Sequence, residues 1–74
     1  MHDMYYRVEI LVDGRTLSWS STNKQTAINQ AKIEAGRGAS VVVWQVMKVD
    51  HPMHNPLVVY AKGARSNGAL YPTD

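Results

Sequence analysis

The sequence predicts an α+β domain: a four-stranded antiparallel sheet in the order β-β-α-β-β, with one helix packed on one face. Three features lead to this fold: alternating apolar residues around an Asp-Gly turn, a segment without Gly or Pro that carries a narrow apolar stripe, and two valine-rich segments joined by a proline-containing loop. Hairpins on both sides of one helix leave the other sheet face bare. We expect a single domain over residues 1–63 and a flexible C-terminal tail over residues 64–74.

The first hairpin is predicted by two independent signals. Apolar side chains alternate with mostly polar ones before the turn, at Tyr6, Val8, Ile10 and Val12. Asp13-Gly14 follows, and this dipeptide favours a two-residue type I′ turn because both central residues need positive φ. A two-residue turn sets Ile10 opposite Leu17 and Val8 opposite Trp19. We expect these four residues to face the helix, and Tyr5, Arg7, Glu9, Ser18 and Ser20 to face outward.

The helix is predicted from Asn23 to Ala35, a stretch with no glycine or proline. Thr22 is the expected N-cap because Gln25 stands at capping-box spacing, and Ser21 is the competing cap. Gly36 is the expected left-handed residue that stops the helix. A stripe of small apolar residues should face the sheet, at Ala27, Ile28, Ala31 and Ala35, with Ile33 exposed.

Two further strands are predicted over residues 40–49 and 57–62, separated by a loop that contains two prolines. Both strands have apolar residues on both faces, so their orientation rests on keeping Gln45 out of the core. That choice places Val42, Trp44 and Val46 toward the helix, and Val41, Val43 and Met47 on the bare face. Similarly, we expect Leu57, Val59 and Ala61 to face inward and Val58, Tyr60 and Lys62 to face outward.

Composition indicates a small soluble cytoplasmic protein. The 74 residues include no cysteine, which excludes disulfides and thiolate metal sites, and the formal net charge is +2. No apolar run is long enough to span a bilayer, and the first residues lack the pattern of a signal peptide. No cysteine nucleophile, Gly-x-Ser-x-Gly motif or plausible pair of buried carboxylates is present. We therefore expect no enzymatic activity and no cofactor.

Two short patterns have ordinary structural interpretations. His51 and His54 have a spacing that could bind a metal ion, but they lie in a proline-containing loop without a third ligand, so we interpret them as exposed. Gly36-Arg37-Gly38 follows a helix rather than preceding one, so it cannot act as a phosphate loop. It is better interpreted as a helix cap and turn that exposes Arg37.

The bare sheet face is the candidate binding surface. Tyr5, Tyr60, Arg7 and Lys62 are expected on it, and exposed aromatic and apolar groups typically mark an interaction surface. The alternatives are that the tail folds across this face, that it forms a homodimer interface, or that its tyrosines stack bases of single-stranded nucleic acid. The string of basic, glycine and aromatic residues typical of RNA-recognition domains is missing.

Three segments carry a resemblance to a known class of proteins. Gln30-Ala31-Lys32, Val46-Met47-Lys48-Val49 and Leu57-Val58-Val59-Tyr60-Ala61-Lys62 resemble parts of small phage anti-CRISPR proteins, and more broadly the chain looks like an early phage product. The resemblance implies a steric inhibitor in the host cytoplasm that binds a CRISPR surveillance complex or RNA polymerase. It implies six contact candidates, Arg7, Arg37, Lys48, Tyr60, Lys62 and Arg65, and Tyr5 on the bare face is the seventh.

Overall fold

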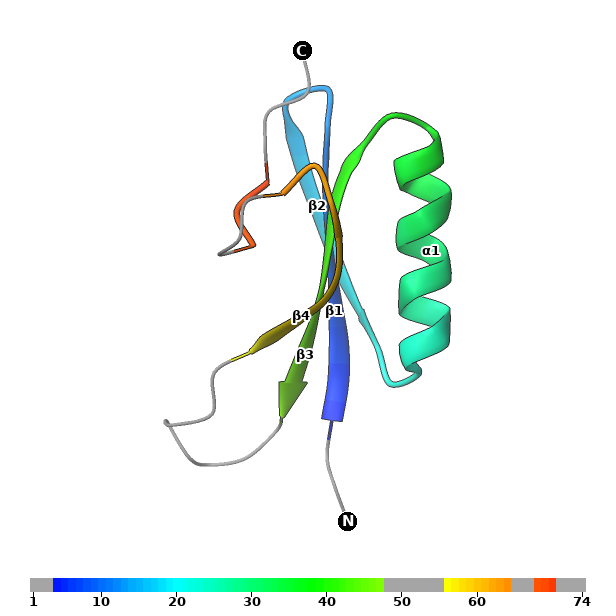
Figure 1. The fold of residues 1–74 in the computed structure, drawn as a ribbon, viewed down its shortest axis with the longest axis vertical. Coiled ribbons are helices and arrows are strands. Elements are labelled where there is room, and N and C mark those ends of the chain that lie inside the picture. Colours follow the sequence, from blue (N-terminus) through cyan, green and yellow to red (C-terminus); the bar gives the residue numbers. More distant parts are fainter. Residues whose placement is uncertain (1–3, 48–55, 65–67, 71–74) are drawn as a thin grey trace.

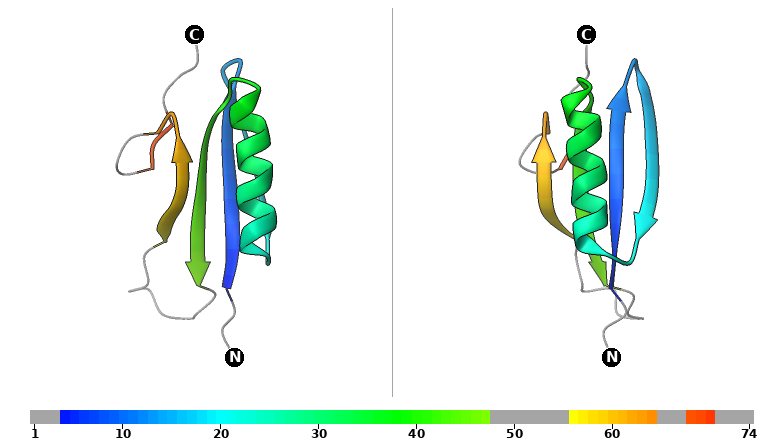
Figure 2. Two further views of the ribbon diagram at one scale, coloured as in Figure 1. Left: turned by 45° about the vertical axis from the view of Figure 1, so that its right-hand side comes forward. Right: turned by 90° about the vertical axis from the view of Figure 1, so that its right-hand side faces the viewer.

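A computed structural model describes residues 4–47, 56–64 and 68–70. The elements are β1 (Met4–Val12), β2 (Arg15–Ser21), α1 (Lys24–Gly36), β3 (Ser40–Met47) and β4 (Leu57–Lys62). The strands form one antiparallel sheet in the order β2-β1-β3-β4. The helix covers one face (Figure 1) and lies over the central strands β1 and β3 (Figure 2). The predicted α+β class and element order are confirmed.

The hairpin of β1 and β2 has the predicted turn and register. Asp13 and Gly14 both have positive φ, at 50° and 73°, as a type I′ turn requires. Ile10 stands opposite Leu17 and Val8 opposite Trp19. Leu17 is nonetheless 51% exposed, because β2 is an edge strand and the helix lies over its neighbours.

The helix begins one residue later than predicted. Asn23 is the N-cap, and its side-chain oxygen accepts a hydrogen bond from the Thr26 amide at 3.0 Å. The predicted cap at Thr22 is therefore wrong. The competing candidate, Ser21, instead holds the cap in place: its hydroxyl accepts from the Asn23 amide at 3.1 Å. Asparagine competes well here because it is among the strongest N-cap residues.

The helix ends at Gly36, but Gly36 is not the left-handed residue that was predicted. Arg37 is the C-cap, and Gly38 has a φ of 97°. The amides of Gly38 and Ala39 donate to the carbonyls of Ala35 and Glu34, which satisfies the last turn. Residues 36–38 form a helix cap and turn, as predicted. The left-handed glycine is Gly38, whereas Gly36 is the last helical residue.

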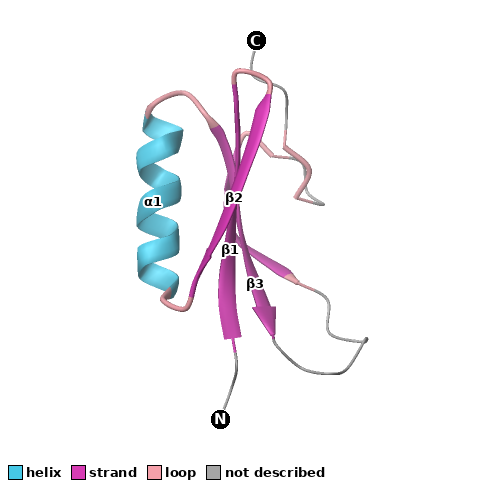
Figure 3. Ribbon diagram, turned by 180° about the vertical axis from the view of Figure 1, so that it is seen from behind, coloured by secondary structure: helices cyan, strands magenta, loops and turns pink. Residues whose placement is uncertain are grey.

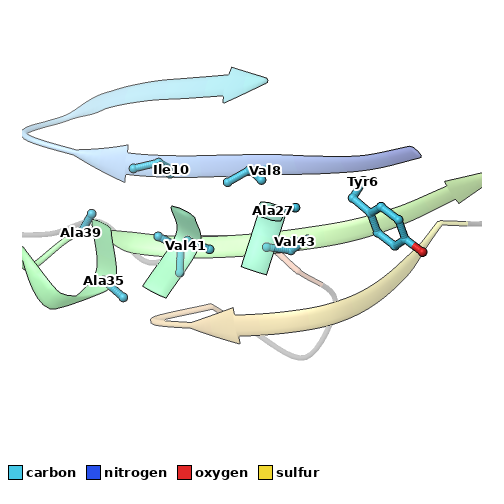
Figure 4. Close-up of a cluster of buried hydrophobic side chains, with 9 residues drawn as sticks. Tyr6, Val8, Ile10, Ala27, Ala35, Ala39, Val41 and Val43 are labelled. Atoms are coloured by element: carbon cyan, nitrogen blue, oxygen red, sulfur yellow. The ribbon is translucent and has the colours of Figure 1, made fainter. Parts of the chain in front are cut away.

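The main core lies between α1 and the sheet (Figure 4). On the helix side it consists of Ala27, Ala31 and Ala35, the predicted stripe of small residues. Alanines let the helix lie close to the strands, so that short Val and Ile side chains suffice to fill the space. The strands contribute Tyr6, Val8, Ile10, Val41 and Val43. Ile33 is 49% exposed, as predicted.

The predicted orientation of β3 is wrong. Val43 stands opposite Val8 and Val41 opposite Ile10, so Val41 and Val43 face the helix. Val42, Trp44 and Val46 therefore lie on the opposite face. The rule that Gln45 must avoid the core does not decide the matter, because Gln45 lies toward the end of the strand and is only half-buried.

The predicted orientation of β4 is wrong in its second half, at Tyr60, Ala61 and Lys62, and holds for Val58 and for Val59, which packs against the core. Tyr60 stands opposite Val43 and Lys62 opposite Val41, which places both on the helix face. The pairing shifts between Val43 and Trp44, and beyond this irregularity Val58 stands opposite Trp44 on the other face. Ala61, expected inside, is opposite Val42 and also lies on that other face.

Candidate protein-binding face

The sheet face opposite the helix is called the open face below. Alternation along each strand and the observed registers define its members. They are Tyr5, Arg7, Glu9, Leu11, Thr16, Ser18, Ser20, Ser40, Val42, Trp44, Val46, Val58 and Ala61.

Arg7 has two aromatic neighbours on this face, which together with it are called the aromatic cluster. Tyr5 precedes it on the same face of β1, and Trp44 stands directly opposite it on β3. All three residues are partly exposed. The Nε atom of Arg7 is nevertheless buried and has no hydrogen-bond partner in the described part of the chain. Buried polar atoms are nearly always paired in folded proteins, so a buried donor with no acceptor among the described residues is unusual.

Glu9, two residues further along β1 on this face, forms no ion pair with Arg7. Its carboxylate accepts a hydrogen bond from the indole N–H of Trp44. Within the described residues the ion pair present joins Arg37 to Glu34 at 3.2 Å, on the helix. Among the described residues, Arg7 therefore has no ion-pair partner, and Tyr5 and Trp44 are its neighbours on the face.

One end of the open face is occupied by the C-terminal segment. Residues 68–70 lie on the side of the sheet away from the helix (Figures 1 and 3), and Leu70 bridges to Ala64. Gly68 is buried, and a Cβ added to it would overlap the Trp44 ring atoms Cζ2 and Cη2. Four residues of the predicted flexible tail thus contact the fold, whereas their mobility stays a prediction.

Two hollows mark the two ends of the open face. A hollow of about 430 Å³ lies beside the C-terminal segment, lined by Glu9, Leu11, Thr16, Trp44 and residues 68–70. Another, of about 460 Å³, lies at the other end and is lined by Tyr5, Ser20, Ser21 and Thr22. Arg7 stands opposite Ser20 in the sheet but does not line this second hollow. Both hollows are open to solvent, which suits docking of a surface group rather than enclosure of a small substrate.

The structure separates the seven contact candidates. Tyr5 and Arg7 share the open face. Tyr60 and Lys62 face the helix, where the Lys32 ammonium lies 5.9 Å from the centre of the Tyr60 ring. Arg37 is at the C-terminal end of α1, in the ion pair with Glu34. Lys48 and Arg65 lie outside the described residues, as do His51 and His54.

Trp44 is the member of the cluster that sequence reasoning missed, because it was assigned to the core. The pairing of β1 with β3 would have identified it, since Trp44 stands opposite Arg7. That pairing joins strands far apart in the chain, and no turn residue specifies it.

Two other features, a metal site and a membrane-spanning helix, are absent within residues 4–47, 56–64 and 68–70. These residues contain no group of three or more His, Cys, Asp or Glu side chains arranged to hold a metal ion. Nor do they contain a helix of the length and apolarity that crossing a membrane requires. No family model matches the chain, and no curated protein or solved structure is significantly similar to it.

Proposed function

We propose that this protein is a non-catalytic binding protein that docks on an acidic site of a partner protein through its open face. Arg7 is the anchor, and Tyr5 and Trp44 flank it. The observation that carries this proposal is the guanidinium of Arg7, which pairs with no described acid and has Tyr5 and Trp44 as neighbours on the face. A partner carboxylate would bind the terminal nitrogens of this guanidinium and neutralise its charge.

The composition of the cluster supports a protein interface. Tyr, Trp and Arg are the residues most enriched among those that dominate binding energy, and such residues group together near the centre of an interface. A carboxylate binds guanidinium in a planar, two-bonded geometry that lysine cannot reproduce. The formal net charge of +2 favours approach to an acidic surface.

Single-stranded nucleic acid fits the same face less well. Stacking of bases needs accessible aromatic rings, and part of the Trp44 ring is covered by Gly68. The carboxylate of Glu9, held beside that ring by the indole N–H, would repel a phosphate backbone. Glu9 would also repel an acidic side chain of a protein partner, so the covered Trp44 ring is the feature that distinguishes the two classes of partner.

The finer proposal concerns the partner's identity. We propose that the partner is a host nucleic-acid-processing complex, a CRISPR surveillance complex or RNA polymerase, which the protein blocks sterically as a phage inhibitor in the host cytoplasm. This rests on the resemblance of three segments to small phage anti-CRISPR proteins.

The anchor is tested by comparing two arginine variants that remove the same charge. Arg7→Ala should weaken binding to a purified target complex by about 2 kcal/mol, or about thirtyfold in Kd. Arg15→Ala, an exposed arginine outside the open face, should leave binding within about twofold. Equal effects of the two variants would show that only overall charge matters and would overturn the anchor.

Two further measurements separate the alternatives. Lys62→Ala tests the helix face, and a loss as large as that of Arg7→Ala would contradict docking through the open face. Labelled single-stranded DNA and RNA should not shift with the protein alone. A shift that weakens steeply as salt rises, and that Arg7→Ala abolishes, would support the nucleic-acid alternative instead. Steric inhibition itself is measured as loss of target-DNA binding by the surveillance complex, or of transcription by the polymerase.

A further inference from the structure

The outer edge of β2 is a second surface, with which no described residue pairs. Within the part of the chain that the structure describes, β2 is at the end of the sheet and pairs only with β1, through every residue from Arg15 to Ser21 without a bulge. The strand contains no proline or lysine, which are the residues that commonly protect an edge against further pairing. β4, the other edge, is shorter, and its pairing with β3 shifts register between the β3 residues Val43 and Trp44. A bulge of that kind disfavours pairing.

The turn determines which backbone groups of β2 point outward. In the type I′ turn the Val12 carbonyl accepts from the Arg15 amide, so Val12 and Arg15 form a hydrogen-bonded pair. Hydrogen-bonded pairs alternate along an antiparallel ladder, which directs Leu17, Trp19 and Ser21 toward β1 as well. The amides and carbonyls of Thr16, Ser18 and Ser20 therefore point away from the sheet.

From this edge we infer that two copies of the chain associate by antiparallel pairing of β2 with β2, about a twofold axis at Ser18. This register pairs the whole strand. Ser18 meets Ser18 of the second copy, and Thr16 meets Ser20, so that all the outward backbone groups exchange hydrogen bonds. Such self-complementarity is what a twofold interface requires.

The side chains fit the same register. Leu17 stands opposite Trp19 of the second copy in a non-hydrogen-bonded pair, where side chains approach most closely. Leu17, which is 51% exposed in the single chain, becomes covered by an aromatic ring. Arg15 is the only charged residue of β2, and it meets Ser21, so that no like charges face each other. A second copy therefore supplies hydrogen-bond partners for the outward backbone groups, covers the exposed Leu17, and brings no like charges together.

Such an interface would add buried apolar area, which a small domain lacks. The core is built from valines, alanines and one isoleucine beside Tyr6, which provides limited apolar burial. The twofold axis is perpendicular to the sheet, so both helices lie on one side and both open faces on the other. Arg7 is not covered, and association of two copies is independent of the proposed partner binding.

The oligomeric state of the wild-type protein is the first test. Sedimentation over a dilution series should show the mass rising from 8.3 kDa toward twice that value. Hydrogen exchange followed by NMR should show that the amides of Thr16, Ser18 and Ser20 become protected as concentration rises. A mass of one chain at every concentration, with no change in those three amides, would overturn the inference.

Matched variants locate the interface. Leu17→Glu should weaken association at least about tenfold, whereas Ile33→Glu should change it less than about twofold, although Ile33 is 49% exposed. Because the chain has no cysteine, Ser18→Cys provides a clean second readout. Paired Cα atoms about 5.5 Å apart permit a disulfide, so this variant should cross-link under mild oxidation at least about ten times faster than Ile33→Cys. Equal rates for the two cysteine variants would exclude pairing at Ser18.

Discussion

Replacing Gly68 with alanine tests how tightly the C-terminal segment is packed on the sheet. Gly68 has a φ of 87°, a conformation that costs a residue with a Cβ about 1–2 kcal/mol. The new methyl group would also overlap the Trp44 ring, whose indole N–H is held by the hydrogen bond to Glu9. Overpacking of this kind adds about 1–3 kcal/mol.

Gly38 provides the matched control. Its φ is 97°, but a Cβ added there has no atom within 4 Å, so Gly38→Ala carries the conformational cost without the steric one. We expect Gly68→Ala to reduce the free energy of unfolding by about 1–3 kcal/mol more than Gly38→Ala does. For a domain of this size each kcal/mol lowers Tm by about 4–8 °C.

The assay combines urea unfolding with tryptophan emission. The Trp19→Phe background leaves Trp44 as the only tryptophan, so that a shift to longer wavelength in Gly68→Ala reports separation of the segment from the ring. If the segment leaves the sheet, the loss of stability is limited to the free energy of its docking. Equal stability of the two alanine variants, with unchanged Trp44 emission, would refute the packing of Gly68 on Trp44.

Two further predictions concern the helix ends. Asn23→Ala should cost about 0.5–2 kcal/mol of stability through loss of the N-cap, and Thr22→Ala should cost less. If Thr22→Ala instead lowered Tm more than Asn23→Ala, the N-cap would be Thr22, as predicted from the sequence. Gly36→Ala should raise stability by about 0.5–1 kcal/mol, because Gly36 is helical and a methyl group there meets nothing within 4 Å. A lower Tm would contradict the helical assignment of Gly36.

Local sequence signals predicted the parts of the fold that depend on near neighbours. The register of β1 and β2 follows from Asp13-Gly14, since a two-residue turn leaves a single possible pairing. The helix and its alanine stripe follow from spacing within one element. The choice among Ser21, Thr22 and Asn23 as cap was not predictable, because all three residue types cap helices.

The candidate site was predicted in part, for a reason that lies in the two later strands. β3 and β4 have apolar residues on both faces, so alternation does not say which face meets the helix. The pairing of β1 with β3 decides it, and this pairing placed Trp44 beside Arg7 and moved Tyr60 to the helix.

Taken by itself, the sequence determined the first hairpin, the helix, and the position of Tyr5 and Arg7 on the face away from the helix. Only the tertiary structure decided which residues surround Arg7, and that Gly68 covers part of the Trp44 ring. The physical reason is the range of the interactions. A turn or a helical stripe is specified by residues a few positions apart, whereas the open face is assembled by contacts between segments that meet only in the folded chain.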